Sequence, residues 1–223
     1  MPKRKELLVT GEIYHVYNRS VANQEIFMSK KELARVLALI DYYRFKQSLK
    51  FSKFNTLSGE KKKAHLSEIK ETAAVVEIYA YALMSDHYHL LIKQKQDKGI
   101  KDFVSNFQNG FAKYYNLKNE NRGSLFINPF KAKRIVSEEV LIHVSRYIHL
   151  NPVTSYLFPA GELSHNLRTS YPDYLTTDET KRSMVNPDLI LGIFGNQQKY
   201  QRFLADQVDY QRQLGAMKKF VLE

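Results

Sequence analysis

The chain contains no cysteine, and this absence excludes several kinds of site at once. Disulfide bonds, zinc sites built from thiolates and cysteine nucleophiles all require a thiol. Any metal ion must therefore bind through histidine, carboxylate or amide groups.

Long apolar segments are missing as well. The first residues, Met-Pro-Lys-Arg-Lys-Glu-Leu-Leu-Val, are basic but lack the apolar stretch of a signal peptide. No run approaches the roughly 20 apolar residues that span a bilayer. There is also no internal repeat and no low-complexity tract. We expect a protein of the cytoplasm, associated with the nucleoid, that has no membrane partner.

Positive charge, in contrast, is in excess. Among the 223 residues, 34 lysines and arginines oppose 23 acidic residues, which leaves a net charge of +11. A surplus of this size favours a polyanionic partner such as nucleic acid. Hydrophobic residues make up 43% of the chain, which is enough for a sizeable core.

Hydrophobic patterns predict seven elements in the order β-α-β-β-α-β-α. The strands are expected at residues 12–18, 75–83, 87–92 and 130–136, and the helices at residues 30–44, 100–117 and 137–151. Ser29 and Glu32 are spaced as a capping box, and Pro152 is expected to stop the last helix. The order matches an α+β fold of the ferredoxin-like or RRM-like type. Its antiparallel sheet has helices on one face, and the other face is free for a ligand.

Two segments lie outside this plan. Residues 44–63 carry many lysines and arginines but Glu60 as their one acid. We interpret residues 44–70 as a basic insertion, whose part at residues 44–63 is either mobile near nucleic acid or a solvated loop. Further helices are expected at residues 187–194 and 198–217. The chain is thus divided into a folded domain at 1–156 and a mostly helical extension at 157–223.

A pair of histidines marks the predicted third strand. His87 and His89 are two residues apart, so both side chains point to the same face, while Tyr88 points into the core. Two imidazoles on an open sheet face can share one metal ion. His15, on the first strand, could face the same side. The pair alone is a weak signal, because most His-x-His pairs bind no metal.

The helix expected at residues 140–151 carries a polar stripe of His143, Tyr147 and Asn151, spaced four residues apart. The amide oxygen of Asn151 can be a third metal ligand, and the Tyr147 phenol then lies where a metal-bound phosphate would be. Phenol is a poor nucleophile at neutral pH, so it needs a metal to polarise the phosphate. A phosphotyrosine would store the energy of the broken bond for rejoining. We expect His143 to lie at the helix surface and His149 to be structural.

Together these motifs resemble the single-tyrosine HUH transposases, specifically the IS200-like and REP-associated tyrosine transposases. The resemblance covers roughly residues 11–156. It is carried by Tyr-His-Val-Tyr-Asn-Arg at 14–19, Met-Ser-Asp-His-Tyr-His-Leu-Leu-Ile at 84–92, Gly-Ser-Leu-Phe at 123–126, Phe-Lys-Ala at 130–132 and Arg-Tyr-Ile-His-Leu-Asn-Pro-Val at 146–153.

The resemblance implies a role for each matched residue. His87 and His89 would be the metal-binding pair, Asn151 the third ligand of an Mg²⁺ or Mn²⁺ ion, and Tyr147 the nucleophile. Members of the family cleave single-stranded DNA beside hairpins, become linked to the 5′ phosphate and leave a free 3′ hydroxyl. The expected partner is therefore single-stranded DNA with a hairpin, bound by a monomer or a homodimer.

DNA contacts are assigned by charge alone, to Arg19, Lys131, Lys133 and Arg134. Two other functions stay open. The chain could be a domesticated, catalytically silent nucleic-acid-binding protein, or an RNA binder that stacks bases on strand aromatics. Such a stacking platform would consist of Tyr14, Tyr79 and Tyr81.

Overall fold

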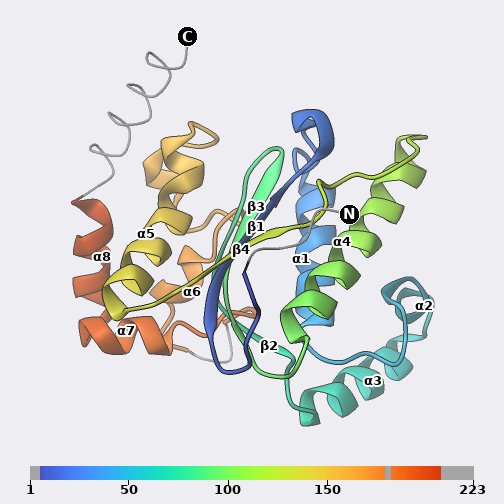
Figure 1. Cartoon of the computed structure of the whole chain (residues 1–223), viewed down its shortest axis with the longest axis horizontal. Helices are drawn as coiled ribbons and strands as arrows, with labels where there is room; N and C mark the ends of the chain where they lie inside the picture. Colours follow the sequence, from blue (N-terminus) through green and yellow to red (C-terminus); the bar gives the residue numbers. More distant parts are fainter. Residues whose placement is uncertain (1–5, 179–181, 207–223) are drawn as a thin grey trace.

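The structure is a computed structural model that describes residues 6–178 and 182–206. An antiparallel four-stranded sheet in the order β2-β3-β1-β4 forms its centre (Figure 1). The strands are β1 Ile13–Arg19, β2 Val76–Leu83, β3 His87–Gln94 and β4 Lys131–Arg134. The helices are η1 Val21–Asn23, α1 Lys30–Tyr43, α2 Phe51–Asn55, α3 Gly59–Glu71, α4 Gly99–Lys118, α5 Glu138–Thr154, η2 Ala160–Glu162, α6 Tyr171–Leu175, α7 Asp188–Phe194 and α8 Gln197–Ala205. The expected α+β fold is confirmed.

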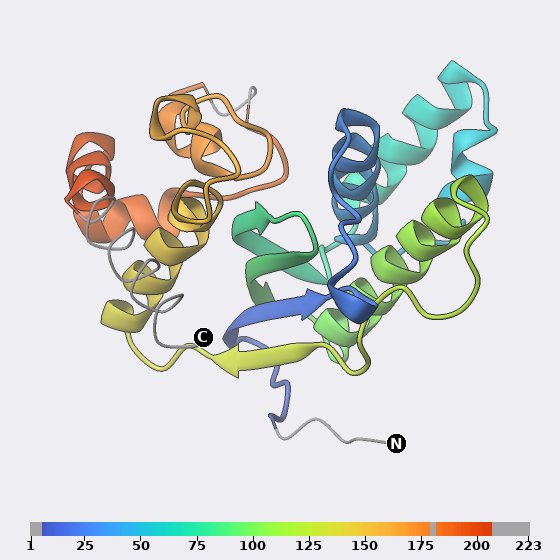
Figure 2. The ribbon, with the colours of Figure 1, turned by 90° about the horizontal axis from the view of Figure 1, so that it is seen from above.

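One face of the sheet is covered by α1 and α4, which lie side by side in Figures 1 and 2. The predicted capping box starts α1, because the Ser29 side chain accepts from the Glu32 N–H and the Glu32 carboxylate accepts from the Ser29 N–H. Tyr88 is fully buried on this side, and its ring contacts Phe107 with the ring centroids 5.2 Å apart. The residue between the two histidines thus anchors β3 in the dry core.

The other face is less free than expected. Helix α5 crosses it against β2 and β3, and α7 and α8 pack behind α5 (Figure 2). The hydroxyl of Tyr174 in α6 donates to the backbone oxygen of Tyr79 at 2.7 Å, which ties the C-terminal segment to β2. Over β1 and β4, however, Tyr17 is half-buried and Lys131 and Lys133 are exposed. Among the described residues, this half of the face is the more open to a ligand.

Residues 44–70 are not the mobile or solvated loop that their charge indicated. They contain α2 and most of α3, whose buried aromatic side chains hold them to α1. Phe51 and Phe54 lie 5.2 and 4.9 Å from the Tyr42 ring, and His65 is hydrogen-bonded to the Tyr42 hydroxyl at 3.2 Å. Hydrophobic periodicity did not predict α2, because a helix of only five residues is too short to show a repeating pattern.

Pro152 does not stop α5, which continues to Thr154. Proline removes one backbone donor, but near a helix end only that single bond is lost. The ladder resumes at once, since the Ser155 N–H donates to the Asn151 oxygen at 3.0 Å. The prediction of a helix end at residue 151 was therefore wrong by one turn.

The expected helix at residues 187–194 corresponds to α7, and the one expected from residue 198 corresponds to α8. Its continuation to residue 217, like the basic pair Lys218 and Lys219, lies outside the described residues. The described helices include none that is long and apolar enough to cross a membrane. The division of the chain at residue 156 stays a prediction.

Candidate active site

The strand register brings the candidate histidines together. Tyr17 of β1 lies opposite His89 of β3, and Arg19 lies opposite His87, so their side chains share one face of the sheet. The His89 ring centroid lies 5.1 Å from those of both His87 and His15. The three imidazoles form one cluster at the edge of the surface that α5 covers.

Hydrogen bonds occupy one nitrogen of each β3 histidine. Asp86 bonds to Nδ1 of His87, and Nε2 of His15 lies 2.9 Å from Nδ1 of His89. When each Nδ1 carries the proton, both Nε2 atoms keep their lone pairs. Nε2 of His89 is buried and has no hydrogen-bond partner among the described residues. A buried nitrogen without a partner is the arrangement expected of a vacant ligand atom.

The cluster also favours neutral imidazoles. Burial, together with the neighbouring His15 and His87, lowers the pKa of His89 to about 2. Burial, aided by Lys133, lowers the pKa of His15 to about 4. For His87, burial lowers the pKa while Asp86 opposes that change. Neutral imidazole is the form that binds metal ions.

Helix α5 places Tyr147 over this cluster. Its ring centroid lies 5.4 Å from that of His89 and 6.1 Å from that of His15, both edge to face. The side chain is 41% exposed, so a ligand can reach it. Burial raises the pKa of the Tyr147 phenol, and the Asn151 amide opposes that rise. Helix α5 therefore brings the Tyr147 ring next to His89 and His15.

Asn151, one helical turn after Tyr147, is 7% exposed. Its amide nitrogen is buried without a partner among the described residues, and its oxygen accepts from the Ser155 hydroxyl at 3.3 Å. A half-turn of the amide exchanges the two atoms. Within residues 6–178 and 182–206, no group of three or more His, Asp or Glu side chains is arranged to hold a metal ion. The role of Asn151 as a third metal ligand stays a prediction.

Three of the four predicted DNA contacts lie on this face. Arg19 and Lys131 line a cavity of about 450 Å³ together with His87, His89 and Tyr147. Lys133 lies opposite His15 in the β1–β4 register and points to the same side.

Arg134 lies opposite Tyr14 in that register, on the other face of the sheet. There it pairs with Glu12, with Nε and the carboxylate oxygen 3.0 Å apart. The structure therefore separates Arg134 from the site. The sequence could have predicted that Arg134 and Lys133 lie on opposite faces, because neighbouring residues of a strand point to opposite sides of the sheet.

Asp86 was not anticipated as a site residue. The sequence placed it only in a turn. In the structure its carboxylate bonds to Nδ1 of His87, and its other oxygen lies 3.4 Å from Nε of Arg19. A carboxylate directly before a candidate metal histidine is the signal that could have found it. His15 was expected only to share the open face, and its bond to His89 was not foreseen.

The remaining candidates fall outside the site. His143 is exposed and bonds to Arg146 at 2.8 Å, and His149 is fully buried. Tyr14, Tyr79 and Tyr81 are at most 4% exposed, so they offer no stacking platform to RNA bases. The aromatic platform was therefore a wrong interpretation.

An α+β sheet with clustered histidines beneath a helical tyrosine agrees with the class of protein that the sequence motifs indicated. The family described as "Transposase IS200 like" matches residues 47–151, which include His87, His89, Tyr147 and Asn151. The resemblance is thus confirmed over this segment, and the match supports a transposase function.

A solved structure of a REP-associated tyrosine transposase bound to a REP hairpin is similar to the chain, with a TM-score of 0.54 and 13% sequence identity. The alignment covers 83% of this chain and 98% of that one. At this identity the likeness establishes the fold alone. No curated protein matches the chain.

Proposed function

We propose that the chain is a metal-dependent transposase-type endonuclease that cleaves and rejoins single-stranded DNA near hairpins. Tyr147 is its nucleophile, and His87, His89 and Asn151 hold an Mg²⁺ or Mn²⁺ ion. The observation that carries the proposal is the position of the Tyr147 ring, 5.4 Å from the ring of His89, whose buried Nε2 has no partner among the described residues.

The reaction exchanges one phosphate ester for another. The Tyr147 oxygen bonds to the phosphorus as the bond from phosphorus to the 3′ oxygen breaks. The phenol proton goes to solvent, and the departing oxygen takes up a proton from solvent to become a 3′ hydroxyl. The DNA on the other side of the break stays attached to Tyr147 through its 5′ phosphate. Attack by a 3′ hydroxyl on this phosphotyrosine rejoins a strand and restores the phenol.

The donor set fits a divalent ion. Two neutral imidazole nitrogens and an amide oxygen leave positions for water and phosphate oxygens, which Mg²⁺ and Mn²⁺ prefer. When bound, the ion would polarise the scissile phosphate and stabilise the charge that develops on it. Asp86 and His15 serve this site by holding the imidazoles in the required tautomer.

The basic side chains around the cavity favour DNA as its ligand. Arg19 and Lys131 line it, and Lys133 lies on the same face of the sheet. They can neutralise phosphates on both sides of the scissile bond, and such contacts make binding sensitive to salt. Arg134 is paired on the other face and takes no part in this proposal.

A labelled hairpin tests the proposal. The oligonucleotide comes from DNA flanking the chain's own gene and is incubated with Mn²⁺. On a denaturing gel a 3′ label should move to the protein, while a 5′ label stays on a shorter free strand. Tyr147→Phe should abolish the adduct. The matched control is Tyr114→Phe, which removes the hydroxyl of a tyrosine in α4 and should still form the adduct.

An adduct that survives Tyr147→Phe would assign the nucleophile to another residue. Salt-sensitive binding without any adduct, whatever divalent metal is added, would instead favour a catalytically silent DNA-binding protein. Adduct formation with the opposite label pattern would show linkage to a 3′ phosphate and contradict the proposed polarity.

A further inference from the structure

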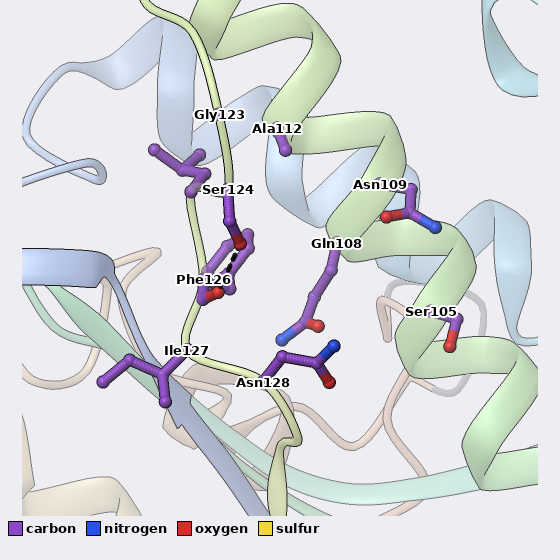
Figure 3. A pocket seen from close by; sticks show the side chains of 10 residues that line it. Ser105, Gln108, Asn109, Ala112, Gly123, Ser124, Phe126, Ile127 and Asn128 are labelled. Atoms are coloured by element: carbon purple, nitrogen blue, oxygen red, sulfur yellow. Dashed lines mark hydrogen bonds between the residues drawn. The ribbon is translucent and has the colours of Figure 1, made fainter. Parts of the chain in front are cut away.

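A second cavity, of about 300 Å³, lies beside the candidate active site. It is formed between α4 and the segment at residues 123–128, and Figure 3 shows its lining. Helix α4 contributes Ser105, Gln108 and Asn109, which are three and four residues apart and so share one helix face. The facing segment contributes Ser124, Ile127 and Asn128.

The polar side chains of this cavity are uncharged, and most of them make no hydrogen bond within the described residues. The ten lining residues, all in the described part of the chain, include no charged side chain. Within that part, the side chains of Ser105, Asn109 and Asn128 make no hydrogen bond. Gln108 donates through its amide nitrogen to the Tyr88 hydroxyl at 2.8 Å, which leaves its oxygen to accept. In Figure 3 the Gln108 side chain extends from α4 toward the segment that carries Asn128.

This chemistry suits a nucleobase better than a phosphate. A phosphate calls for cations or clustered N–H donors, whereas an amide offers a donor and an acceptor side by side. The edge of a base presents the same alternation, and asparagine and glutamine pair with bases in this way. A base that has left its helix must be enclosed in a pocket and bonded along its edge.

The cavity adjoins the site through a single wall residue. Ile127 lines both this cavity and the one that contains Tyr147, and it is 48% exposed. Its backbone is fixed to β1, because its N–H donates to the Arg19 oxygen at 2.9 Å and its oxygen accepts from the Asn18 amide at 2.7 Å. The cavity lies on the α4 side of the sheet, where Gln108 bonds to Tyr88, and Tyr147 lies on the other side. A strand whose phosphate lies at Tyr147 therefore reaches the cavity by passing around Ile127.

We propose that this cavity receives one unpaired nucleobase of the DNA strand, next to the scissile phosphate. Gln108 and Asn128 bond to the edge of the base, and the exposed part of Ile127 supports its face. The cavity thereby selects the nucleotide beside the cut. This inference rests on the proposed function, since it takes the strand to lie at Tyr147.

Binding measurements with abasic DNA test it. The protein carries Tyr147→Phe, so that no adduct forms, and fluorescent hairpin oligonucleotides each lack one base in the unpaired flank. A single abasic position should weaken binding by about tenfold, the usual magnitude for one enclosed base. In Asn128→Ala, and separately in Gln108→Leu, intact and abasic DNA should bind equally, because the contact is already lost.

The matched control is Asn106→Ala, an exposed asparagine of α4 that lines a different cavity. It should keep the full abasic penalty, and thermal unfolding checks that every variant is folded. The assignment is overturned if no abasic position weakens binding, or if the penalty persists in both cavity variants. Adduct formation by the unaltered chain is measured separately. An adduct without the coupled penalty rejects the base pocket alone, whereas absence of an adduct counts against the proposed cleavage.

Discussion

His149 and His89 are both buried histidines whose pKa is lowered by burial, to about 3 and about 2 respectively. They differ in their hydrogen bonds. Nδ1 of His149 lies 2.8 Å from the Tyr200 hydroxyl, and its Nε2 lies 2.8 Å from the Ser170 hydroxyl. Nε2 of His89 has no partner in the part of the chain that is described.

This difference in hydrogen bonding indicates that His149 is structural and that Nε2 of His89 is available to a ligand. A buried polar atom without a partner costs about 1–3 kcal/mol, so a fold retains one only where something compensates. His149 joins α5 to α8 through Tyr200 and to the segment before α6 through Ser170. Its neighbour two residues earlier, Tyr147, faces the open cluster instead. One side of α5 thus carries the proposed nucleophile Tyr147, and the other side carries His149, which anchors the helix.

The largest expected effect comes from removing each histidine in turn. His89→Ala should lower the rate of adduct formation about 10³-fold or more, because the metal contributes several kcal/mol to the reaction. It should lower the free energy of unfolding by less than His149→Ala does, because it loses one hydrogen bond, between Nδ1 and His15, and Nε2 has no partner among the described residues. Adduct kinetics and urea unfolding measure the two effects.

His149→Ala is the counterpart and should show the opposite pattern. The free energy of unfolding should fall by about 2–4 kcal/mol, because a buried ring and two hydrogen bonds are lost. Mn²⁺ affinity of the folded variant, measured by titration calorimetry, should stay unchanged. If His89→Ala destabilises the chain as much as His149→Ala, the two histidines are equivalent and the comparison fails.

A smaller effect is expected at His15, which holds Nδ1 of His89 and touches no DNA in our proposal. His15→Leu removes the acceptor and should weaken Mn²⁺ binding about 10- to 100-fold, the usual cost of losing a group that orients a ligand. His15→Gln keeps an acceptor at a similar reach and should restore most of the affinity. Calorimetric titration with Mn²⁺ in the absence of DNA measures both.

The matched control for His15 is His143→Leu, an exposed histidine on α5 that should leave Mn²⁺ affinity unaltered. Unchanged affinity in His15→Leu would show that His89 needs no orienting partner. Failure of His15→Gln to recover binding would point to a role that only an imidazole can perform.

Much of the fold could be predicted because the apolar residues of its helices and strands recur at regular spacing. Helix α4, expected at residues 100–117, spans Gly99–Lys118, and its apolar stripe is one face of a long helix. The shared face of His87 and His89 followed from strand alternation alone. Tyr147 and Asn151 followed from helical spacing together with the family resemblance.

What escaped prediction depends on contacts between distant segments. The bond from His15 to His89 joins residues 74 positions apart, and only the β1–β3 register reveals it. The C-terminal segment is held to β2 by the hydrogen bond from the Tyr174 hydroxyl to the Tyr79 backbone oxygen. The sequence around Tyr174 does not indicate this partner. Helix α2 is too short for periodicity to show, and its place is fixed by Phe51 and Phe54 against Tyr42.

The smallest effect is a pH dependence of stability contributed by His149. In the unfolded chain its imidazole takes up a proton near its ordinary pKa of about 6.5, but in the folded chain only near about 3. Between these values the unfolded state binds more protons, so the free energy of unfolding falls as the pH falls. From pH 7 to 5.5 this one group should remove about 1 kcal/mol.

His89 and His15 shift stability in the same direction, so the contribution of His149 is isolated by difference. Urea unfolding at pH 7 and at pH 5.5 compares the unaltered chain with His149→Gln, which cannot titrate. The variant should be less stable at both values, but its loss between them should be smaller by about 1 kcal/mol. Equal losses would mean that His149 takes up its proton without unfolding. The hydrogen bonds to Tyr200 and Ser170 would then not keep the His149 ring neutral. His149 and His89 would still differ in one respect, because Nε2 of His89 has no hydrogen-bond partner among the described residues.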